Sequence, residues 1–128
     1  MGLWVLLRHD LPDGSWHHDW MMERDVSEAD FLLTFRLNPE VVWPPSSGFS
    51  ATRIGDHRRE YLTYEGPVSR GRGHVRRVSR GRCELRFEGK ELVVGFDGRW
   101  FRGISEGSHS RAGEQPWVFQ QITVNLED

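Results

Sequence analysis

The chain has 128 residues, a formal net charge of −2, six tryptophans and seven phenylalanines. This length predicts one domain, residues 1–128, with a sizeable core, and the small charge excludes a protein drawn to nucleic acid by its overall charge. The single cysteine, Cys83, excludes an internal disulfide, and the apolar run at residues 3–7 is too short for a signal peptide or a membrane span. We therefore expect a cytoplasmic monomer with no membrane partner.

In chain order, the pattern is one of many short strands separated by turns. The predicted strands are residues 2–8, 16–23, 31–37, 49–55, 60–64, 74–79, 82–87, 91–96, 99–104 and 117–126. Glu88-Gly89 and Asp97-Gly98 predict hairpins, residues 26–31 favour at most one helical turn, and residues 105–116 form a predicted polar loop. So many strands predict an all-β fold, a small closed or nearly closed β-barrel with short irregular connections, because closure removes exposed sheet edges. Trp4, Trp20 and Trp100 are expected in its core.

His9, His17 and Asp19 form the most informative pattern in the chain. Side chains alternate between the two faces of a strand, so His17 and Asp19 share a face while His18 points the other way. The turn residues at 10–15 predict a hairpin that brings His9 beside His17. Two neutral imidazoles and a carboxylate suit zinc, iron or manganese, and three protein ligands leave positions open for water or substrate. The alternative is that these are solvated histidines on an exposed hairpin.

Arginine is concentrated between residues 69 and 82. This stretch holds six arginines and no acidic residue, in a chain with sixteen arginines and one lysine. Planar guanidinium groups match phosphate oxygens, and neutralising a nucleic-acid backbone releases counterions, so the stretch favours a polyanion and binding that weakens with salt. The alternative is an ordinary solvated face whose arginines reflect genome composition.

Two motifs resemble the 3′-phosphoesterase domain of bacterial DNA ligase D and its stand-alone relatives. The family's opening motif is a histidine, a short spacer and then His-Tyr-Asp-Phe-Arg-Leu-Glu. It is similar to His9, a spacer longer by two residues, and HHDWMME at residues 17–23. The family's second motif, Asp-His-Pro-Leu-Glu-Tyr followed by Phe-Glu-Gly and a glycine-rich turn, is similar to DHRREY at 56–61, YEGP at 64–67 and GRG at 71–73. The likeness covers roughly residues 3–122.

The resemblance implies a barrel whose crater holds manganese, or another divalent metal such as zinc, and which removes a 3′-ribonucleotide or 3′-phosphate during break repair. By position, His9, His17 and Asp19 are the implied metal ligands, and His57 and Tyr61 the implied contacts to the scissile phosphate. The implied partners are nucleic-acid 3′ ends and, beyond them, repair ligase or polymerase proteins. The candidate contacts to phosphate or nucleic acid are Arg53, Arg58, Arg70, Arg72 and Arg76.

One departure from the family bears on activity. Where the family has an arginine two residues after the metal-binding aspartate, this chain has Met21, on the same strand face as His17 and Asp19. A thioether cannot replace a charge-assisted fork to phosphate, and losing one such group costs on the order of 10²-fold in rate. Arg53 or Arg58 could substitute from a neighbouring strand. The sequence leaves three functions open: an active phosphoesterase, a non-catalytic module that binds nucleic-acid ends or a repair partner, and a barrel unrelated to nucleic acid.

Overall fold

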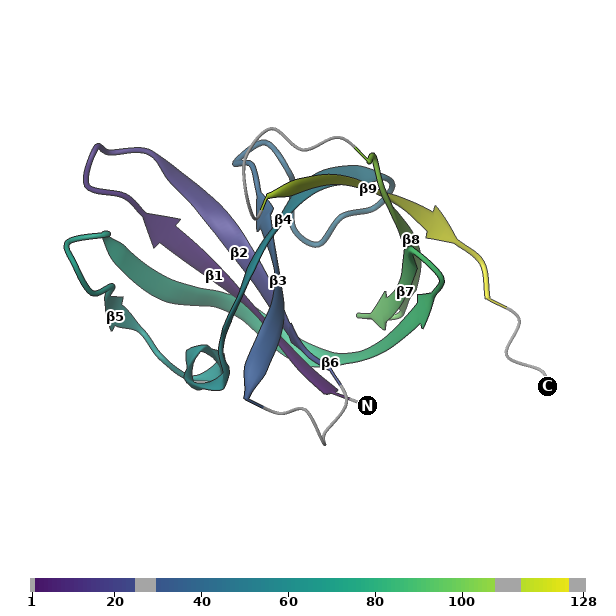
Figure 1. Cartoon of the computed structure of the whole chain (residues 1–128), viewed down its shortest axis with the longest axis horizontal. Helices are drawn as coiled ribbons and strands as arrows, with labels where there is room; N and C mark the ends of the chain where they lie inside the picture. Colours follow the sequence, from purple (N-terminus) through teal and green to yellow (C-terminus); the bar gives the residue numbers. More distant parts are fainter. Residues whose placement is uncertain (1, 25–29, 108–113, 125–128) are drawn as a thin grey trace.

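The computed structural model describes residues 2–24, 30–107 and 114–124. Its elements are β1 (Gly2–Asp10), β2 (Trp16–Glu23), β3 (Phe31–Leu37), β4 (Phe49–Arg58), the 3₁₀ helix η2 (Arg59–Leu62), β5 (Gly66–Pro67), β6 (His74–Glu88), β7 (Glu91–Phe96), β8 (Arg99–Ser105) and β9 (Gln115–Ile122). The order β1-β2-β3-β4-β9-β8-β7-β6 closes through pairing of β1 with β6 into an eight-stranded antiparallel barrel, with β5 outside it on β6 (Figure 1). The predicted all-β barrel is confirmed.

The barrel interior is filled by aromatic rings. Trp20 is fully buried and its ring lies within 6.1 Å, centroid to centroid, of the rings of Phe35, Phe49, Phe96 and Phe119. These residues alternate along their strands with outward-facing ones, as a closed sheet around a side-chain core requires. The large rings therefore fill the interior as a packed core, which stabilises the barrel and leaves no open channel among the described residues.

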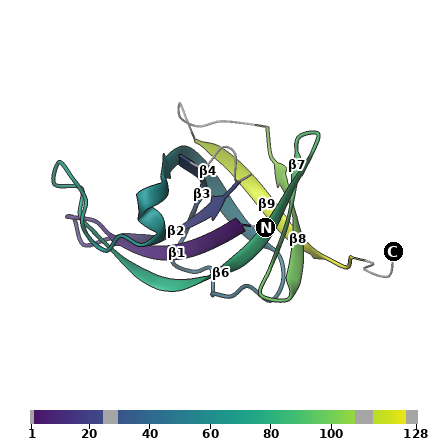
Figure 2. The same cartoon turned by 90° about the horizontal axis from the view of Figure 1, so that it is seen from below.

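A second, smaller apolar layer lies on the outer face of β1, β2 and β3. Val5, Leu7, Met21 and Leu32 point away from the interior and are at most 1% exposed. They are covered by four side chains of the segment between β4 and β6, namely Tyr61, Leu62, Tyr64 and Val68. This outer layer fixes the covering segment, which includes η2 and β5, against the barrel wall (Figure 2).

The ends of β1, β4 and β9 differ by two to four residues from the predicted strands 2–8, 49–55 and 117–126, and two other predictions are wrong in kind. Residues 60–64 form most of η2 and its end, not a strand, and the carbonyl of Glu60 accepts hydrogen bonds from the amides of Thr63 and Tyr64. The turn lets Tyr61, Leu62 and Tyr64 all reach the outer layer, whereas an extended strand would place successive side chains on opposite faces. Residues 74–79 and 82–87 are parts of the single strand β6, since Gly81 continues the strand beside the indole of Trp4, where a Cβ would lie 2.8 Å from Nε1.

Several smaller expectations have different outcomes. Trp4 and Trp20 are buried, but Trp100 is half-buried on the outer face against Gly95, because its neighbour Phe101 points inward. Cys83 is buried, and burial raises the pKa of its thiol to about 12. The predicted 105–116 loop is shorter at both ends, since β8 includes Ser105 and β9 begins at Gln115. The helical turn predicted at 26–31 falls mostly outside the described residues. Among the described residues, no helix could cross a membrane.

Candidate functional site

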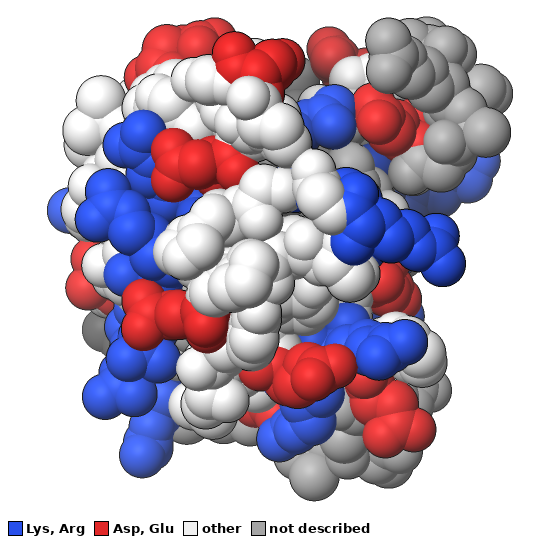
Figure 3. Space-filling view, turned by 90° about the vertical axis from the view of Figure 1, so that its left-hand side faces the viewer, with Lys and Arg blue, Asp and Glu red and all other residues white. Residues whose placement is uncertain are grey.

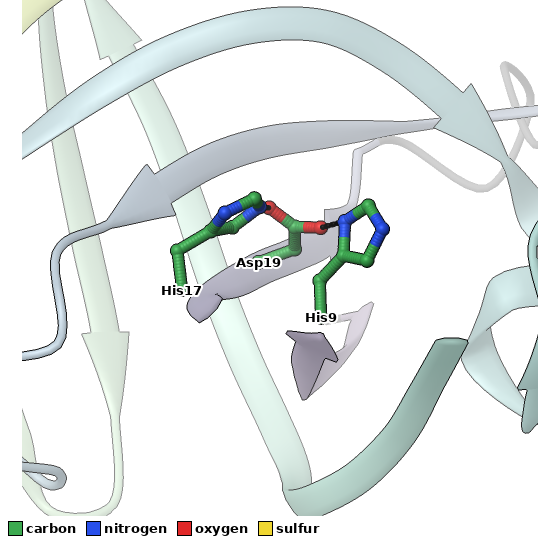
Figure 4. Close-up of side chains that lie close together, drawn as sticks. All are labelled: His9, His17 and Asp19. Carbon is green, nitrogen blue, oxygen red and sulfur yellow. Dashed lines mark ion pairs between the residues drawn. The ribbon is translucent and has the colours of Figure 1, made fainter. Parts of the chain in front are cut away.

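The three predicted metal ligands converge on one spot. The register of β1 with β2 places His9 directly opposite His17, and Asp19 is two residues farther along the same face. The carboxylate lies between the two rings, with Oδ1 3.1 Å from His17 Nε2 and Oδ2 3.6 Å from His9 Nδ1 (Figure 4). One ligand atom from each residue lies within 4.8 Å of the others, so this group could hold a metal ion.

The carboxylate of Asp19 is unusually placed for an acidic group. Asp19 is only 3% exposed, and its Oδ1 has no hydrogen-bond partner among the described residues, since His17 Nε2 is close but not aligned for a hydrogen bond. Burial by itself raises the pKa of Asp19, but the contacts with His17 and His9 outweigh it and lower the pKa to about 2. The group is therefore a buried anion at neutral pH, and a buried charge of this kind calls for a cation beside it.

The backbone around His9 selects one form of its ring. His9 Nε2 lies 2.7 Å from the carbonyl oxygen of Arg72, and because a carbonyl can only accept, Nε2 carries the hydrogen. The other nitrogen, Nδ1, faces Asp19. A neutral imidazole fixed this way presents a lone pair on Nδ1, the arrangement in which a backbone carbonyl orients a metal-binding histidine. In the metal-free protein, the contact with Asp19 raises the pKa of His9, although burial works against it.

Gly73 makes this contact between the Arg72 carbonyl and His9 sterically possible. Its φ is +99°, a conformation that side chains rarely adopt, and a Cβ there would overlap the carbonyl oxygen of Asp10. The glycine-rich turn at 71–73 therefore lies directly against the end of β1. At Gly73 the backbone thus comes close to β1 beside the candidate metal ligand His9.

A cavity of about 490 Å³ is lined by two of the three candidate ligands, His9 and Asp19. Its floor includes His9, Asp19 and Met21, and its opposite wall includes His57, Tyr61 and Arg72. These residues lie on the outer face of the barrel wall, because Leu6 and Trp20 occupy the interior face of the same strands. The crater implied by the resemblance is thus a hollow between the wall and the segment at 59–73, and the aromatic interior has no part in it.

His57 presents one free ring nitrogen. Its Nδ1 lies 2.9 Å from the carbonyl oxygen of Gly55 and donates to it, which leaves Nε2 without a hydrogen-bond partner among the described residues. The rings of His57 and Tyr61 are in edge contact, 5.7 Å apart, and positive charge on His57 lowers the pKa of Asp19 further. An imidazole that can hold or release a proton therefore lines the same cavity as the Asp19 carboxylate and Tyr61, an arrangement that allows acid–base chemistry.

The five arginines predicted to contact phosphate separate into two groups. Arg58 and Arg72 line the cavity, and the guanidinium of Arg72 is held by Ser69 through contacts of 2.9 Å to its carbonyl and 3.0 Å to its Oγ. The other three do not line it. Arg53 lies opposite Phe35, on the interior side of β4, Arg70 occupies the turn with φ +62°, and Arg76 lies opposite Arg8, on the face away from His9.

Met21 and His18 lie where the alternation predicts. Met21 is 1% exposed, belongs to the outer apolar layer and lines the cavity. His18 is on the opposite face in edge contact with Trp16, and burial lowers its pKa. Sequence reasoning missed Arg36, which lies directly opposite Asp19 on β3 and contacts Glu114 at 2.9 and 3.5 Å. Only the strand register could have placed Arg36 there, and no residue pattern in the sequence encodes it.

Comparison of the chain with protein-family models and with curated proteins finds no match.

Proposed function

We propose that this protein is a divalent-metal-dependent phosphoesterase that trims 3′ ends of nucleic acid, a divergent relative of the ligase D 3′-phosphoesterase domain. One observation carries the proposal. The buried carboxylate of Asp19 lies between two imidazoles, at the floor of a cavity whose wall presents His57 and an arginine. An anionic ligand set beside groups suited to phosphate is the combination that metal-assisted phosphoryl chemistry needs.

His9, through Nδ1, His17, through Nε2, and Asp19 would hold the metal. Their nitrogen and oxygen donors fit manganese and zinc alike, and we propose manganese from the family resemblance. When bound, the metal supplies polarisation of a phosphoryl oxygen and a bound water of lowered pKa.

The protein's own groups divide the remaining tasks. His57, with Nδ1 committed to the Gly55 carbonyl, would act as the imidazolium, giving the proton on Nε2 to the leaving oxygen and keeping the one on Nδ1. Arg72, whose guanidinium is already ordered by Ser69, would bind the phosphate oxygens at the cavity wall. Tyr61 packs against His57 and limits the positions that its ring can take.

A non-catalytic module that binds nucleic-acid ends is the second candidate. Met21 favours it, because an apolar, buried side chain stands on the cavity floor where the family has a charged fork. Such a module would keep the metal and the phosphate contacts but would lack one stabiliser of the transition-state charge.

The test is incubation with manganese and a primer that ends in a 3′-phosphate or a 3′-ribonucleotide. We expect turnover by the wild type, its loss in His17→Ala, and its retention in the matched control His18→Ala, whose side chain is on the opposite face. Salt-sensitive binding of the primer with no turnover supports the binding module. Absence of both turnover and binding at low salt rules out both functions and favours a barrel unrelated to nucleic acid.

A further inference from the structure

A second hollow lies on the far side of η2 from the metal cavity. It has a volume of about 810 Å³ and is bounded by Leu3 of β1, Leu62 of η2, and Arg80 and Arg82 of β6. Glu60 lines both hollows, so they adjoin at η2. This second hollow, bounded by these residues, is called the β6 groove below.

The β6 groove combines apolar and basic surface. Leu3 is 46% exposed, and Arg80 and Arg82 are exposed with no ion pair to any residue that the structure describes. Arg59, which also lines the groove, contacts Glu23. Figure 3 shows basic side chains gathered in a column along one edge of the molecular face that carries η2 and β5. An anion entering the groove therefore meets two guanidinium groups beside apolar side chains.

The strand register connects these arginines to the metal site. On the outer face of the wall, β1 and β6 run side by side from the metal site to the groove. His9 lies opposite Val75 at one end. Farther along, Leu7, Val5 and Leu3 lie opposite Arg77, Arg80 and Arg82, respectively. Arg80 and Arg82 thus follow Val75 along one strand face, roughly 16 and 23 Å away at about 3.3 Å per residue. That spacing corresponds to several nucleotides of a strand whose end lies in the metal cavity.

We propose that the β6 groove binds a single-stranded segment of nucleic acid, several nucleotides from the end that enters the metal cavity. This inference rests on the proposed function for the identity of that end. Arg80 and Arg82 bind the phosphates, and Leu3 and Leu62 contact the sugar or base faces that a single strand exposes.

A single strand fits the groove better than the other polyanions. A duplex presents its phosphates outward and keeps its base faces stacked, so the exposed apolar side chains would have no partner. An acidic peptide would satisfy the arginines, but nothing would then relate the groove to the neighbouring metal cavity through Glu60.

The experiment measures binding of labelled oligothymidylate by fluorescence anisotropy without metal, comparing strands of about 4 and about 12 nucleotides. The variant is Arg80→Gln with Arg82→Gln, and the matched control is Arg86→Gln with Lys90→Gln, which removes two charges outside the groove. The wild type and the control should bind the longer strand on the order of tenfold more tightly, and the double variant should lose that gain. Its salt dependence should also fall, by about 1.4 in the slope of log K against log salt for two phosphate contacts.

Four outcomes overturn the proposal. In the first two, the double variant still binds the longer strand more tightly than the shorter one, or the control loses this preference for the longer strand to the same extent. In the third, base-free polyphosphate binds as tightly as oligothymidylate. In the fourth, polyglutamate binds tightly through Arg80 and Arg82 while oligothymidylate does not bind. Failure of the groove and failure of the proposed enzyme are distinguishable. Loss of the length gain without manganese-dependent turnover supports the groove alone, and turnover with an unchanged length gain supports the enzyme alone.

Discussion

The two faces of the β1–β2 hairpin differ in composition and in the work they do. The interior face carries Trp4, Leu6, Trp20 and Met22, all buried in one aromatic core. The outer face of the same two strands begins with the apolar residues of the outer layer and ends in His9, His17 and Asp19. Because the faces alternate residue by residue, a stability determinant and a candidate metal ligand are often chain neighbours. Of two substitutions one position apart, one should therefore lower stability and the other should weaken metal binding.

The largest effect is expected inside the barrel. Trp20→Ala should lower the free energy of unfolding by about 3–5 kcal/mol, because it removes a fully buried ring and leaves a cavity among five other aromatic rings. The half-buried Trp100, on the outer face, is the matched control, and its replacement by alanine should cost clearly less. Urea denaturation measures both, and equal losses would contradict the division between the faces.

A smaller effect on stability, together with a specific effect on metal binding, is expected at Gly73. Gly73→Ala should cost about 1–3 kcal/mol, because of its positive φ and the overlap of a Cβ with the Asp10 carbonyl. It should also weaken manganese binding about 10–100-fold, since it displaces the Arg72 carbonyl that orients His9.

Gly71→Ala is the control for Gly73→Ala. Gly71 also has a positive φ, +64°, but a Cβ there would have nothing within 4 Å. The Gly71→Ala variant should lose some stability but keep its metal affinity, which isothermal titration calorimetry measures. If both variants bind manganese like the wild type, the turn has no part in orienting His9.

In the metal-free protein, the pKa values of histidines on the two faces should be shifted in opposite directions. The contact with Asp19 raises the pKa of His9 above its usual value of 6.5, while burial lowers that of His18. His9 thus stabilises the fold below its unfolded-state pKa, and this contribution disappears as the pH rises through its folded pKa. Manganese competes with the same proton, so its affinity should fall about tenfold per pH unit below the His9 pKa. Ring-proton NMR and metal titration test this, and a His9 pKa below that of His18 would contradict it.

The smallest effect is expected from the ion pair between Arg24, just after β2, and Asp56 of β4. Arg24 forms two contacts with the carboxylate of Asp56, at 3.0 and 2.8 Å, and both side chains are about a third exposed. Arg24→Gln should cost less than about 1 kcal/mol, because solvent screens such a pair. A loss in urea denaturation comparable with that of Trp20→Ala would contradict this expectation.

The sequence predicts the barrel and the ligand group because both depend on short-range rules. Alternation along β2 places His17 with Asp19, and the turn at 10–15 sets His9 opposite His17. The 3₁₀ helix η2 could not be predicted, because residues 60–64 have the same local composition as a short strand and only the outer layer decides between them. The arginines of β6 could not be placed either, since a bulge in the β1–β6 pairing between Leu6 and Leu7 determines which of them share the face of His9.

The exact pairing of His9 with His17 has a consequence for folding fidelity. A slip of β2 by one position relative to β1 would turn His17 and Asp19 toward the interior, on the opposite face from His9, and would turn Trp20 out of the core. A misaligned hairpin is thus destabilised twice, by burial of an unpaired charge and by exposure of an aromatic ring to water. The aromatic core, which lies on the other face of the strands, therefore favours the one register in which His9, His17 and Asp19 meet.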